Sequence, residues 1–483
     1  MTTMAQFNRN RRFFLKNLGL GAAAMAASGM AARSGEAAGR NGKPNFVFIL
    51  IDDMGWPDPA CYGHSFHETP HIDKLAGQGM KFTDAYAACP VCSPTRASIM
   101  SGQYPARLGL TDFIPGHWRP YEKLRVPINR QQNLPLEALT IAEALKPAGY
   151  TTGVFGKWHL GGQTHFPDKQ GFDDWMVTSG AHFNFRTFPK MDIQKDDYMA
   201  DVLTTKCEQF IEANQNNPFC VFLTHYAVHI PLQARQALIK KYEEKSKPAA
   251  GVNNPVYAAM VEHVDSSVGR VLQKLSDCNL DRNTVVVFFS DNGGLRQIYT
   301  GDGPIVSTND PLRNEKGTLY EGGIRVPLIV RWPGNIEAGA VCREPVSSVD
   351  FYPTFLDIAQ IKKQAGAILD GESLTPLLRQ DGSLKRDAIF WHYPHYHHSA
   401  PAGAIRLGDY KLIEFYDDSH IELYNLRDDI GETRNLAQSM PDRAIALRDR
   451  LAEWRKSVNA QMPAMNPDYD PSRAHEWGKH PDR

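Results

Sequence analysis

The fold class is decided by the stretch Phe46-Val47-Phe48-Ile49-Leu50-Ile51-Asp52-Asp53, near the beginning of a 483-residue chain. Its six consecutive apolar residues are mostly aromatic or β-branched, which predicts a strand buried on both faces, as in a parallel sheet. In such sheets ligands bind outside the carboxyl ends of the strands. Asp52 and Asp53 follow this strand directly, so we expect them at the edge of the sheet where a functional site forms.

Helical and strand patterns alternate further along the chain. Apolar residues recur at helical spacing within residues 199–211 and 257–275, and short apolar runs follow at 219–224 and 284–289. Strands interleaved with helices predict an α/β fold with a large, mostly parallel sheet flanked by helices on both faces.

A second polar pair, Asp291 and Asn292, comes just after the expected strand 284–289 and matches the placement of Asp52 and Asp53. Clustered carboxylates with an amide oxygen suit Ca²⁺ or Mg²⁺ better than zinc. Taken singly, each pair is more typical of turn and cap residues. Two pairs at matching strand ends favour a divalent cation.

The pattern changes after about residue 375. Apolar runs on either side of Gly408-Asp409 predict a hairpin at 404–413, another strand is expected at 421–424, and an amphipathic helix at about 441–458. The expected domain boundaries are 1–38 for a signal peptide, 40–375 for a catalytic α/β domain, and 376–483 for a C-terminal α+β subdomain with an antiparallel sheet.

The overall composition is that of a globular protein, with 42% hydrophobic and 22% charged residues. A formal net charge of -1 gives no reason to expect nucleic acid or an anionic membrane surface as a partner. Seven cysteines, an odd number at scattered positions, exclude a disulfide scaffold.

The N-terminus has the features of an export signal. Arg11 and Arg12 precede an apolar Ala/Gly/Met run that ends near Ala32, which is too short and too rich in glycine for a stable membrane span. Residues 10–16 resemble the twin-arginine motif, which implies export of the folded protein to the periplasm or out of the cell. The alternative is a basic amphipathic N-terminus of a cytosolic protein.

One segment, Cys92-Ser93-Pro94-Thr95-Arg96-Ala97-Ser98-Ile99-Met100-Ser101-Gly102, resembles the signature of the type I, formylglycine-dependent sulfatases. In that family a formylglycine-generating enzyme reads the Pro and Arg and oxidises the Cys. The segment is also typical of a helix N-terminus with Ser93 as the cap and Pro94 in the first turn. The two interpretations agree, because a helix N-terminus helps to bind an anion.

Further motifs follow in the order of that family, and the resemblance extends from Asn45 to about Leu436. They lie at residues 155–161 (FGKWHLG), 224–231 (THYAVHIP) and 314–327 (NEKGTLYEGGIRVP). The catalytic residues that the resemblance implies are Cys92, Arg96, Lys157, His159, His229 and Lys316. The implied cation ligands are Asp52, Asp53, Asp291, Asn292 and the oxygen of residue 92.

The resemblance implies a sulfuric ester hydrolase. One hydroxyl of the hydrated aldehyde at residue 92 would attack sulfur, and loss of a proton from the other would then release sulfate. His159 is the expected base for this release, and His229 the expected acid for the leaving oxygen. Lys157, Lys316 and Arg96 would balance the charge of the sulfate, and Arg96 would also orient residue 92.

Substrate selection is expected from two loops, 111–119 and 392–398. Trp118 could stack on a sugar, while Arg119, His395 and His397 could bind hydroxyls or a second anion. A solvated loop or a second metal site are the alternatives for the histidines. Export and aromatic loops together favour a sulfated polysaccharide, and residues 111–116 resemble bacterial sulfatases that act on galactose-type sugars.

Two other functions compete with this prediction. A phosphatase or phosphonate monoester hydrolase of the same superfamily would share the fold, but the extra His and Asp ligands of a two-metal phosphatase are not apparent. A catalytically inactive, metal-stabilised glycan-binding protein would keep Cys92 as a thiol. The presence of Lys157, His159, His229 and Lys316 argues against it.

Overall fold

The computed structural model describes residues 42–116, 118–127, 132–249, 251–297 and 304–478. The chain divides into two units, Met1–Gly42 and Lys43–Arg483. The signal peptide expected at 1–38, with its twin-arginine motif, lies outside the described residues. Within the described part, no helix is both long enough and apolar enough to cross a membrane.

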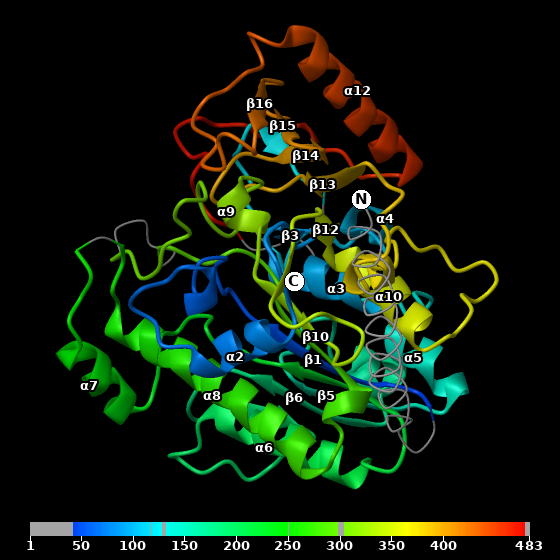
Figure 1. Ribbon diagram of the computed structural model, residues 1–483. Coiled ribbons are helices and arrows are strands. Elements are labelled where there is room, and N and C mark those ends of the chain that lie inside the picture. Colours follow the sequence, from blue (N-terminus) through cyan, green and yellow to red (C-terminus); the bar gives the residue numbers. More distant parts are fainter. Residues whose placement is uncertain (1–41, 117, 128–131, 250, 298–303, 479–483) are drawn as a thin grey trace, which may run out of the picture. The chain divides into compact units, whose positions relative to one another are not determined.

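Nine strands of the described chain form a mixed sheet in the order β11-β2-β10-β9-β1-β8-β5-β6-β7 (Figure 1). The neighbours β9, β1, β8, β5 and β6 run parallel, while β10 and β7 run antiparallel to theirs. The predicted α/β fold with a mostly parallel sheet is therefore confirmed. The strands are β1 (Asn45–Ile51), β2 (Met80–Phe82), β5 (Thr151–Gly156), β6 (Asp174–Ser179), β7 (Arg186–Phe188), β8 (Phe219–Thr224), β9 (Thr284–Ser290), β10 (Leu328–Arg331) and β11 (Ala340–Cys342).

Helices cover both faces of this sheet, which explains why the central strands β1, β8 and β9 are buried at every position (Figure 1). In β1, alternate side chains enter two separate cores, Phe46, Phe48 and Leu50 on one face and Val47, Ile49 and Ile51 on the other. The first core is covered by α3 (Cys92–Ser101), α5 (Ile141–Leu145) and α10 (Phe351–Ile358), and the second by α2 (Pro70–Gln78), α6 (Met199–Ala213) and α8 (Pro255–Asp277). Further helices are α4 (Pro105–Leu108), α7 (Gln236–Glu244), α9 (Glu321–Ile324) and α11 (Thr375–Leu378).

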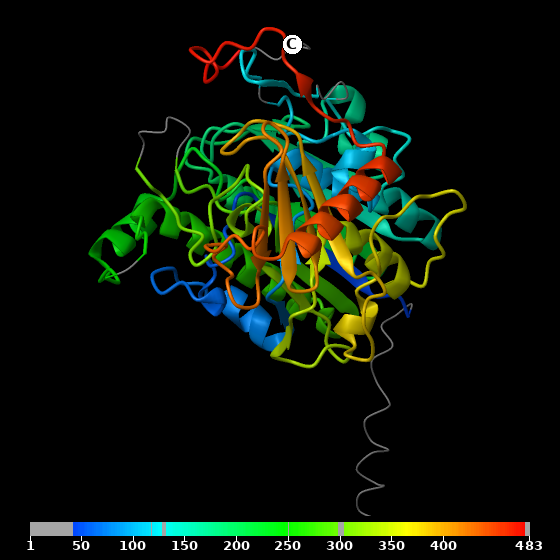
Figure 2. The same cartoon turned by 90° about the horizontal axis from the view of Figure 1, so that it is seen from above.

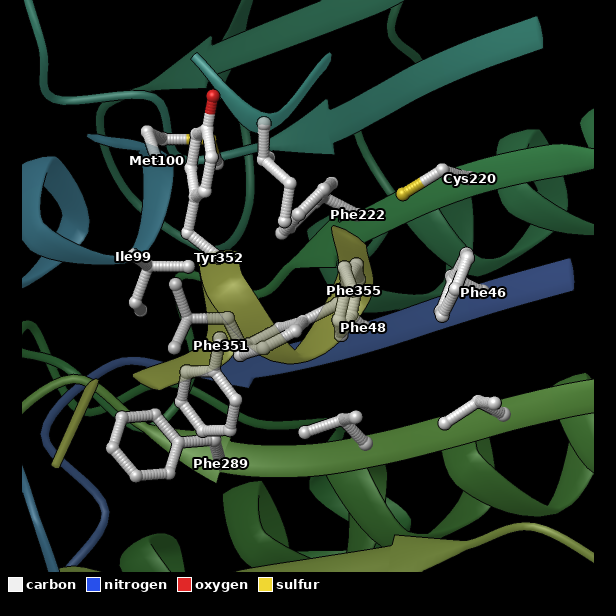
Figure 3. Packing of buried hydrophobic residues seen from close by; sticks show 14 of the residues in the cluster. Phe46, Phe48, Ile99, Met100, Cys220, Phe222, Phe289, Phe351, Tyr352 and Phe355 are labelled. Carbon is white, nitrogen blue, oxygen red and sulfur yellow. The ribbon is translucent and has the colours of Figure 1, made fainter. Parts of the chain in front are cut away.

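Aromatic packing between α10 and the sheet fixes the central strands (Figure 3). The ring of Phe355 stacks on Phe46 with 4.3 Å between centroids, and Phe351 meets Phe48 edge-on at 4.9 Å. Phe351 also contacts Phe289 of β9 at 4.9 Å. Since burial of one such side chain is worth about 1.5–3 kcal/mol, this cluster holds β1 and β9 together, and their ends carry the two polar pairs.

A second, antiparallel sheet follows in the order β13-β14-β15-β16. Figure 2 shows α12 (Pro441–Ser457) lying across one face of it, where Leu412, Leu447 and Leu451 share a small core. The predicted hairpin, strand and helix of this region are thus observed, while the boundary near residue 375 stays a prediction. The strands are β13 (Ala388–Tyr393), β14 (Ala402–Leu407), β15 (Tyr410–Phe415) and β16 (Ile421–Asn425), and two short pairs join β12 (Val346–Ser347) to β3 (Ala85–Tyr86) and β17 (Ala464–Met465) to β4 (Leu124–Arg125).

Buried charges connect this second sheet to the segment that contains Lys316. Lys411 of β15 is fully buried, and its Nζ lies 2.9 Å from both Glu321 Oε1 and Glu432 Oε1. Glu321 also accepts from Arg325 Nε (2.6 Å), and Glu432 accepts from the main-chain N–H of Glu321 (2.7 Å). Because every member is paired, the network positions α9 against the second sheet.

Candidate active site

The candidate site lies where four neighbouring strands, β9, β1, β8 and β5, end at the same edge of the large sheet. Their last residues are in register, with Ile51 beside Ser290, Leu50 beside Thr224, and Thr224 beside Gly156. Each strand is followed within a few residues by predicted site residues. These are Asp291 and Asn292 after β9, Asp52 and Asp53 after β1, His229 after β8, and Lys157 and His159 after β5.

The acidic residues at this edge form a cluster of oxygen donors. Ligand atoms of Asp52, Cys92 and Asp291 all lie within 4.8 Å of one another. Asp52 Oδ1 and Asn292 Oδ1 are buried and have no hydrogen-bond partner in the protein. The amide Nδ2 of Asn292 donates to Asp53 Oδ1 (2.8 Å), which leaves its oxygen for another ligand. Orphaned buried oxygens of this kind fit a hard divalent cation.

Each carboxylate of the cluster has its own basic partner. Lys157 Nζ lies 2.5 Å from Asp52 Oδ2, and Lys316 Nζ lies 2.6 Å from Asp53 Oδ1. Arg96 Nε donates to Asp291 Oδ2 at 2.8 Å, and its NH1 donates to the main-chain oxygen of Lys157 at 2.7 Å. These bonds make Arg96 an orienting partner of Asp291, while the expected bond from Arg96 to residue 92 stays a prediction.

Burial and these partners set the protonation of the cluster. Burial acts to raise the pKa of Asp52, but the nearby positive charges, Lys157 foremost among them, together outweigh it and hold that pKa well below its ordinary value. Burial together with the Asp52 carboxylate raises the pKa of Asp291 to about 7, against the opposing effect of Arg96. Added positive charge at this position would favour the carboxylate form of Asp291.

Cys92 is the first residue of α3 and is buried at the floor of the site. Burial raises the pKa of its thiol. The prediction that Ser93 caps this helix is wrong, because the helix starts at Cys92, two residues earlier than that cap implies, and Val91 is the N-cap residue, without a side-chain bond. Ser93 Oγ instead accepts from the main-chain N–H of Ile114 (3.1 Å), which attaches the 111–119 loop to the helix.

His159 presents an unprotonated ring nitrogen. It has a left-handed backbone (φ 57°), and its Nε2 lies 2.6 Å from the main-chain oxygen of Ile114. A carbonyl oxygen only accepts, so the proton of the neutral ring resides on Nε2 and the lone pair on Nδ1. Nδ1 is buried without a partner in the protein. Burial, and then Lys157, keep the pKa of His159 well below its ordinary value, so the ring is an available proton acceptor.

His229 is arranged the opposite way. Its Nδ1 lies 2.6 Å from the main-chain oxygen of Ile230, so Nε2 is the nitrogen that can exchange a proton with a ligand. Nε2 lies 3.6 Å from Asp53 Oδ2. Burial lowers the pKa of His229 to about 4, with Asp53 favouring the charged form and Lys316 opposing it.

A cavity of about 530 Å³ opens over these groups. Its floor has the charged and polar side chains, and its walls are largely apolar. The floor residues are Cys92, Lys157, His159, His229 and Lys316, and the wall residues include Phe113, Ile114, Trp158, Phe166, Val177, Phe188 and Tyr226.

The four residues expected to select the substrate are not among those that line this cavity. The guanidinium of Arg119 stacks on the ring of Trp477 at 4.1 Å and pairs with Glu122 at 3.1 Å. His395 is buried, with Nε2 2.8 Å from Thr111 Oγ1, and His397 is buried beside Gly317. Trp118 is half-buried. Their binding of substrate stays a prediction.

The walls contain residues that the sequence did not single out. Val177, Thr178, Ser179 and Gly180 come from the end of β6 and Phe188 from β7, the edge hairpin of the sheet. Phe166 packs on Phe188 with 5.6 Å between ring centroids. Phe166 and Phe188 are apolar like the residues of the core, so no local sequence signal distinguishes these wall residues from core residues. In the structure Phe188 is 40% exposed.

Known proteins resemble this chain over most of its length. The family model described as Sulfatase matches residues 44–361, and one described as N-sulphoglucosamine sulphohydrolase, C-terminal, matches 314–457. A sulfatase of Formosa agariphila is 32% identical over 87% of this chain and 90% of its own, and N-acetylgalactosamine-6-sulfatase of Canis lupus familiaris is 32% identical over 78% and 72%. The crystal structure of Ps i-CgsB in complex with k-i-k-neocarrahexaose is 28% identical, with a TM-score of 0.74, over 89% of this chain and 96% of that chain.

The α/β fold, the acidic edge and the buried lysines fit a hydrolase that acts on an anionic ester. The chain belongs to the type I sulfatase family, whose model covers both polar pairs and the Cys92 segment. It is a sulfuric ester hydrolase.

Proposed function

We propose that this enzyme removes sulfate from a sulfated carbohydrate, with residue 92 as formylglycine and Ca²⁺ bound by Asp52, Asp53, Asp291, Asn292 and the oxygen of residue 92. The observation that carries the proposal is the convergence of orphaned buried oxygens, two buried lysines and Cys92 at one edge of the sheet. All-oxygen side-chain donors support Ca²⁺, and Mg²⁺ is the alternative.

The bound cation would act as a Lewis acid at the sulfate, and hydrated formylglycine would supply an oxygen nucleophile. The protein itself contributes positive charge and alignment. Lys157 pairs with Asp52 and Lys316 pairs with Asp53, and both lysines line the cavity. A sulfate bound between the two lysines would therefore be held from two sides. Preorganised charges in a buried site stabilise developing negative charge strongly, which raises the rate of sulfate transfer.

The two histidines would divide the proton transfers. His159 Nδ1 has its lone pair directed away from the bond to Ile114, so it can accept a proton from residue 92 when sulfate is released. His229 Nε2 would donate a proton to the leaving alcohol oxygen. A bound sulfate ester adds negative charge next to His229, as Asp53 already does, and thereby favours the protonated ring.

The wall residues support a carbohydrate substrate. Sugar rings present C–H groups on their faces, and aromatic side chains such as Phe188, Phe113 and Tyr226 can pack on such surfaces. The relatives agree, since one is named N-acetylgalactosamine-6-sulfatase and another was crystallised with a neocarrahexaose. Sulfated, galactose-type sugars outside the cytoplasm are therefore the first substrates to test.

The same proposal includes the partners of the chain. A formylglycine-generating enzyme would modify Cys92, and the twin-arginine machinery would export the folded enzyme to the periplasm or beyond. The N-terminal motif with Arg11 and Arg12 supports this route.

The test combines a mass measurement with an activity assay. The chain is produced with a formylglycine-generating enzyme, the peptide spanning Cys92 is weighed, and sulfate release from sulfated sugars is measured with Ca²⁺, using Cys92→Ala as the control. We expect the aldehyde mass and release only by the modified enzyme. An unmodified thiol without sulfate release, or a preference for phosphate or phosphonate monoesters, would contradict the proposal.

A further inference from the structure

His182 connects the wall of the cavity to the proposed proton donor. It lies in the loop between β6 and β7, and its side chain is fully buried. Its ring Nε2 is 2.8 Å from the main-chain oxygen of His229. His182 is not among the residues that line the cavity, so it would act on the reaction through its neighbours, and its one ring hydrogen bond is to His229.

The chemistry of this contact is defined by its acceptor. A carbonyl oxygen cannot donate, so Nε2 of His182 bears the proton and the ring is a fixed donor. Burial lowers the pKa of His182, although the bond to His229 opposes that shift, and the ring is neutral at ordinary pH. Its Nδ1 is buried without a hydrogen-bond partner in the protein. The side chain of His182 therefore makes one hydrogen bond, to the main-chain oxygen of His229.

The ring of His182 is itself held firmly. Its main-chain N–H donates to Gln233 Oε1 (3.1 Å), and its main-chain oxygen accepts from Met199 N (2.9 Å). The rings of Tyr198 and Tyr226 flank it, with centroids 6.0 and 5.3 Å away. The donor therefore has a fixed direction before any ligand binds.

The position of the His229 ring depends on its own main chain. The main-chain N–H of His229 donates to Tyr226 O (3.0 Å), Nδ1 bonds to Ile230 O, and the carbonyl is bound by His182. Loss of the third contact would free the peptide unit that follows His229. Proton transfer is sensitive to such shifts, because a displacement of about 1 Å can cost about 100-fold in rate.

We propose that His182 is a positioning residue, which aligns the His229 ring with the leaving oxygen and couples this alignment to the β6–β7 wall. The wall residues Val177–Gly180 precede His182 by a few positions, and Phe188 follows it. A leaving group that packs on this wall thus contacts the same β6–β7 hairpin that contains His182. The inference rests on the proposed role of His229 as the acid.

Leaving-group dependence is the test. In the modified, Ca²⁺-loaded enzyme, kcat is compared for a sulfated monosaccharide, whose alkoxide must be protonated, and 4-nitrophenyl sulfate, whose phenolate leaves without a proton. For His182→Phe we expect kcat on the sugar to fall about 10–100-fold and on the aryl ester less than about 3-fold. His182→Gln, whose amide can reach the same carbonyl, should recover most of the loss. His263→Phe, which replaces another histidine ring packed on Tyr198, is the control and should affect both substrates equally.

The outcomes separate the inference from the proposed function. An equal loss on both substrates, or no loss, would refute a positioning role for His182. If His182→Phe does not fold, His182→Gln is compared with His182→Asn, whose side chain is shorter. In that comparison we expect kcat on the sulfated sugar, but not on the aryl ester, to fall in the Asn variant alone. His229→Gln must show the same preference for the aryl ester, and if it does not, the assignment of His229 as the acid fails instead.

Discussion

Replacement of Lys411 by Met should weaken the attachment of the second sheet in a pH-dependent way. Lys411 Nζ is fully buried between Glu321 and Glu432, each at 2.9 Å. Removing one partner from a buried ion pair typically costs about 3–5 kcal/mol. Glu321 keeps Arg325 as a charged partner, whereas Glu432 keeps the main-chain N–H of Glu321, which is uncharged. The loss of stability therefore comes mainly from Glu432, whose carboxylate is left without a charged partner.

The sign of the pH dependence follows from that residue. Burial, with the Glu321 carboxylate, raises the pKa of Glu432 to about 7 even though Lys411 opposes the shift. An acid whose folded pKa is raised binds its proton more tightly in the folded state, so its contribution to stability is lost as pH rises from about 4.5 to above 7. Without Lys411 the pKa rises further. The variant should be near wild type at pH 5 and lose about 2 kcal/mol at pH 8.5, because keeping Glu432 protonated costs about 1.4 kcal/mol for each pH unit above its wild-type pKa.

Amide hydrogen exchange in β15 and α9 measures this loss, because it reports local opening. Since about 1.4 kcal/mol is tenfold, exchange at pH 8.5 should accelerate by about 30-fold after correction for the intrinsic rate. The double variant Lys411→Met with Glu432→Gln should recover most of the protection and abolish the pH dependence. A loss that is the same at pH 5 and pH 8.5, or no loss at all, would refute the reasoning.

Three further predictions concern the site. Ca²⁺ at 100 times its dissociation constant should stabilise the enzyme by about 2.7 kcal/mol in thermal unfolding, and Asp52→Asn should lose most of this gain; a full gain in that variant would exclude Asp52 as a ligand. His159→Gln should release the first equivalent of alcohol normally and then turn over about 100- to 10,000-fold more slowly in stopped-flow assays, and the absence of a burst would argue against its role as the base. Phe188→Ala should raise KM for sulfated sugars about 5- to 30-fold at little cost to stability, whereas Phe188→Tyr should not, and an unchanged KM would exclude a wall contact.

The main sheet and the floor of the site were predictable because their signals are local. The run from Phe46 to Ile51 is apolar at every position, which fits a strand between two cores, and its acidic pair lies at the expected edge. Asp291 and Asn292 repeat this arrangement one strand away. A residue that directly follows a parallel strand must lie at the carboxyl edge of the sheet, so its position can be predicted from the sequence alone.

Other parts depended on contacts between distant segments. Phe166 and Phe188 look like ordinary core residues until the hairpin β6–β7 is placed at the sheet edge beside the cavity. His182 has no motif around it that points to His229, 47 positions away. The cap expected from Ser93 failed for the same reason, since its hydroxyl is used by the 111–119 loop.

The burial of Cys92 has a consequence for the timing of biosynthesis. The side chain is only 2% exposed, and the neighbouring residues Cys89 and Val91 belong to the core under the second sheet. Under the proposed function, a formylglycine-generating enzyme would have to bind the segment before that core closes. Between Gly102 and Asn425, the last residue of that sheet, the ribosome adds about 320 residues, and at about 5–20 residues/s this takes about 15–65 s. Under the same proposal, oxidation slower than this would yield a folded chain that keeps the Cys92 thiol and has no sulfatase activity.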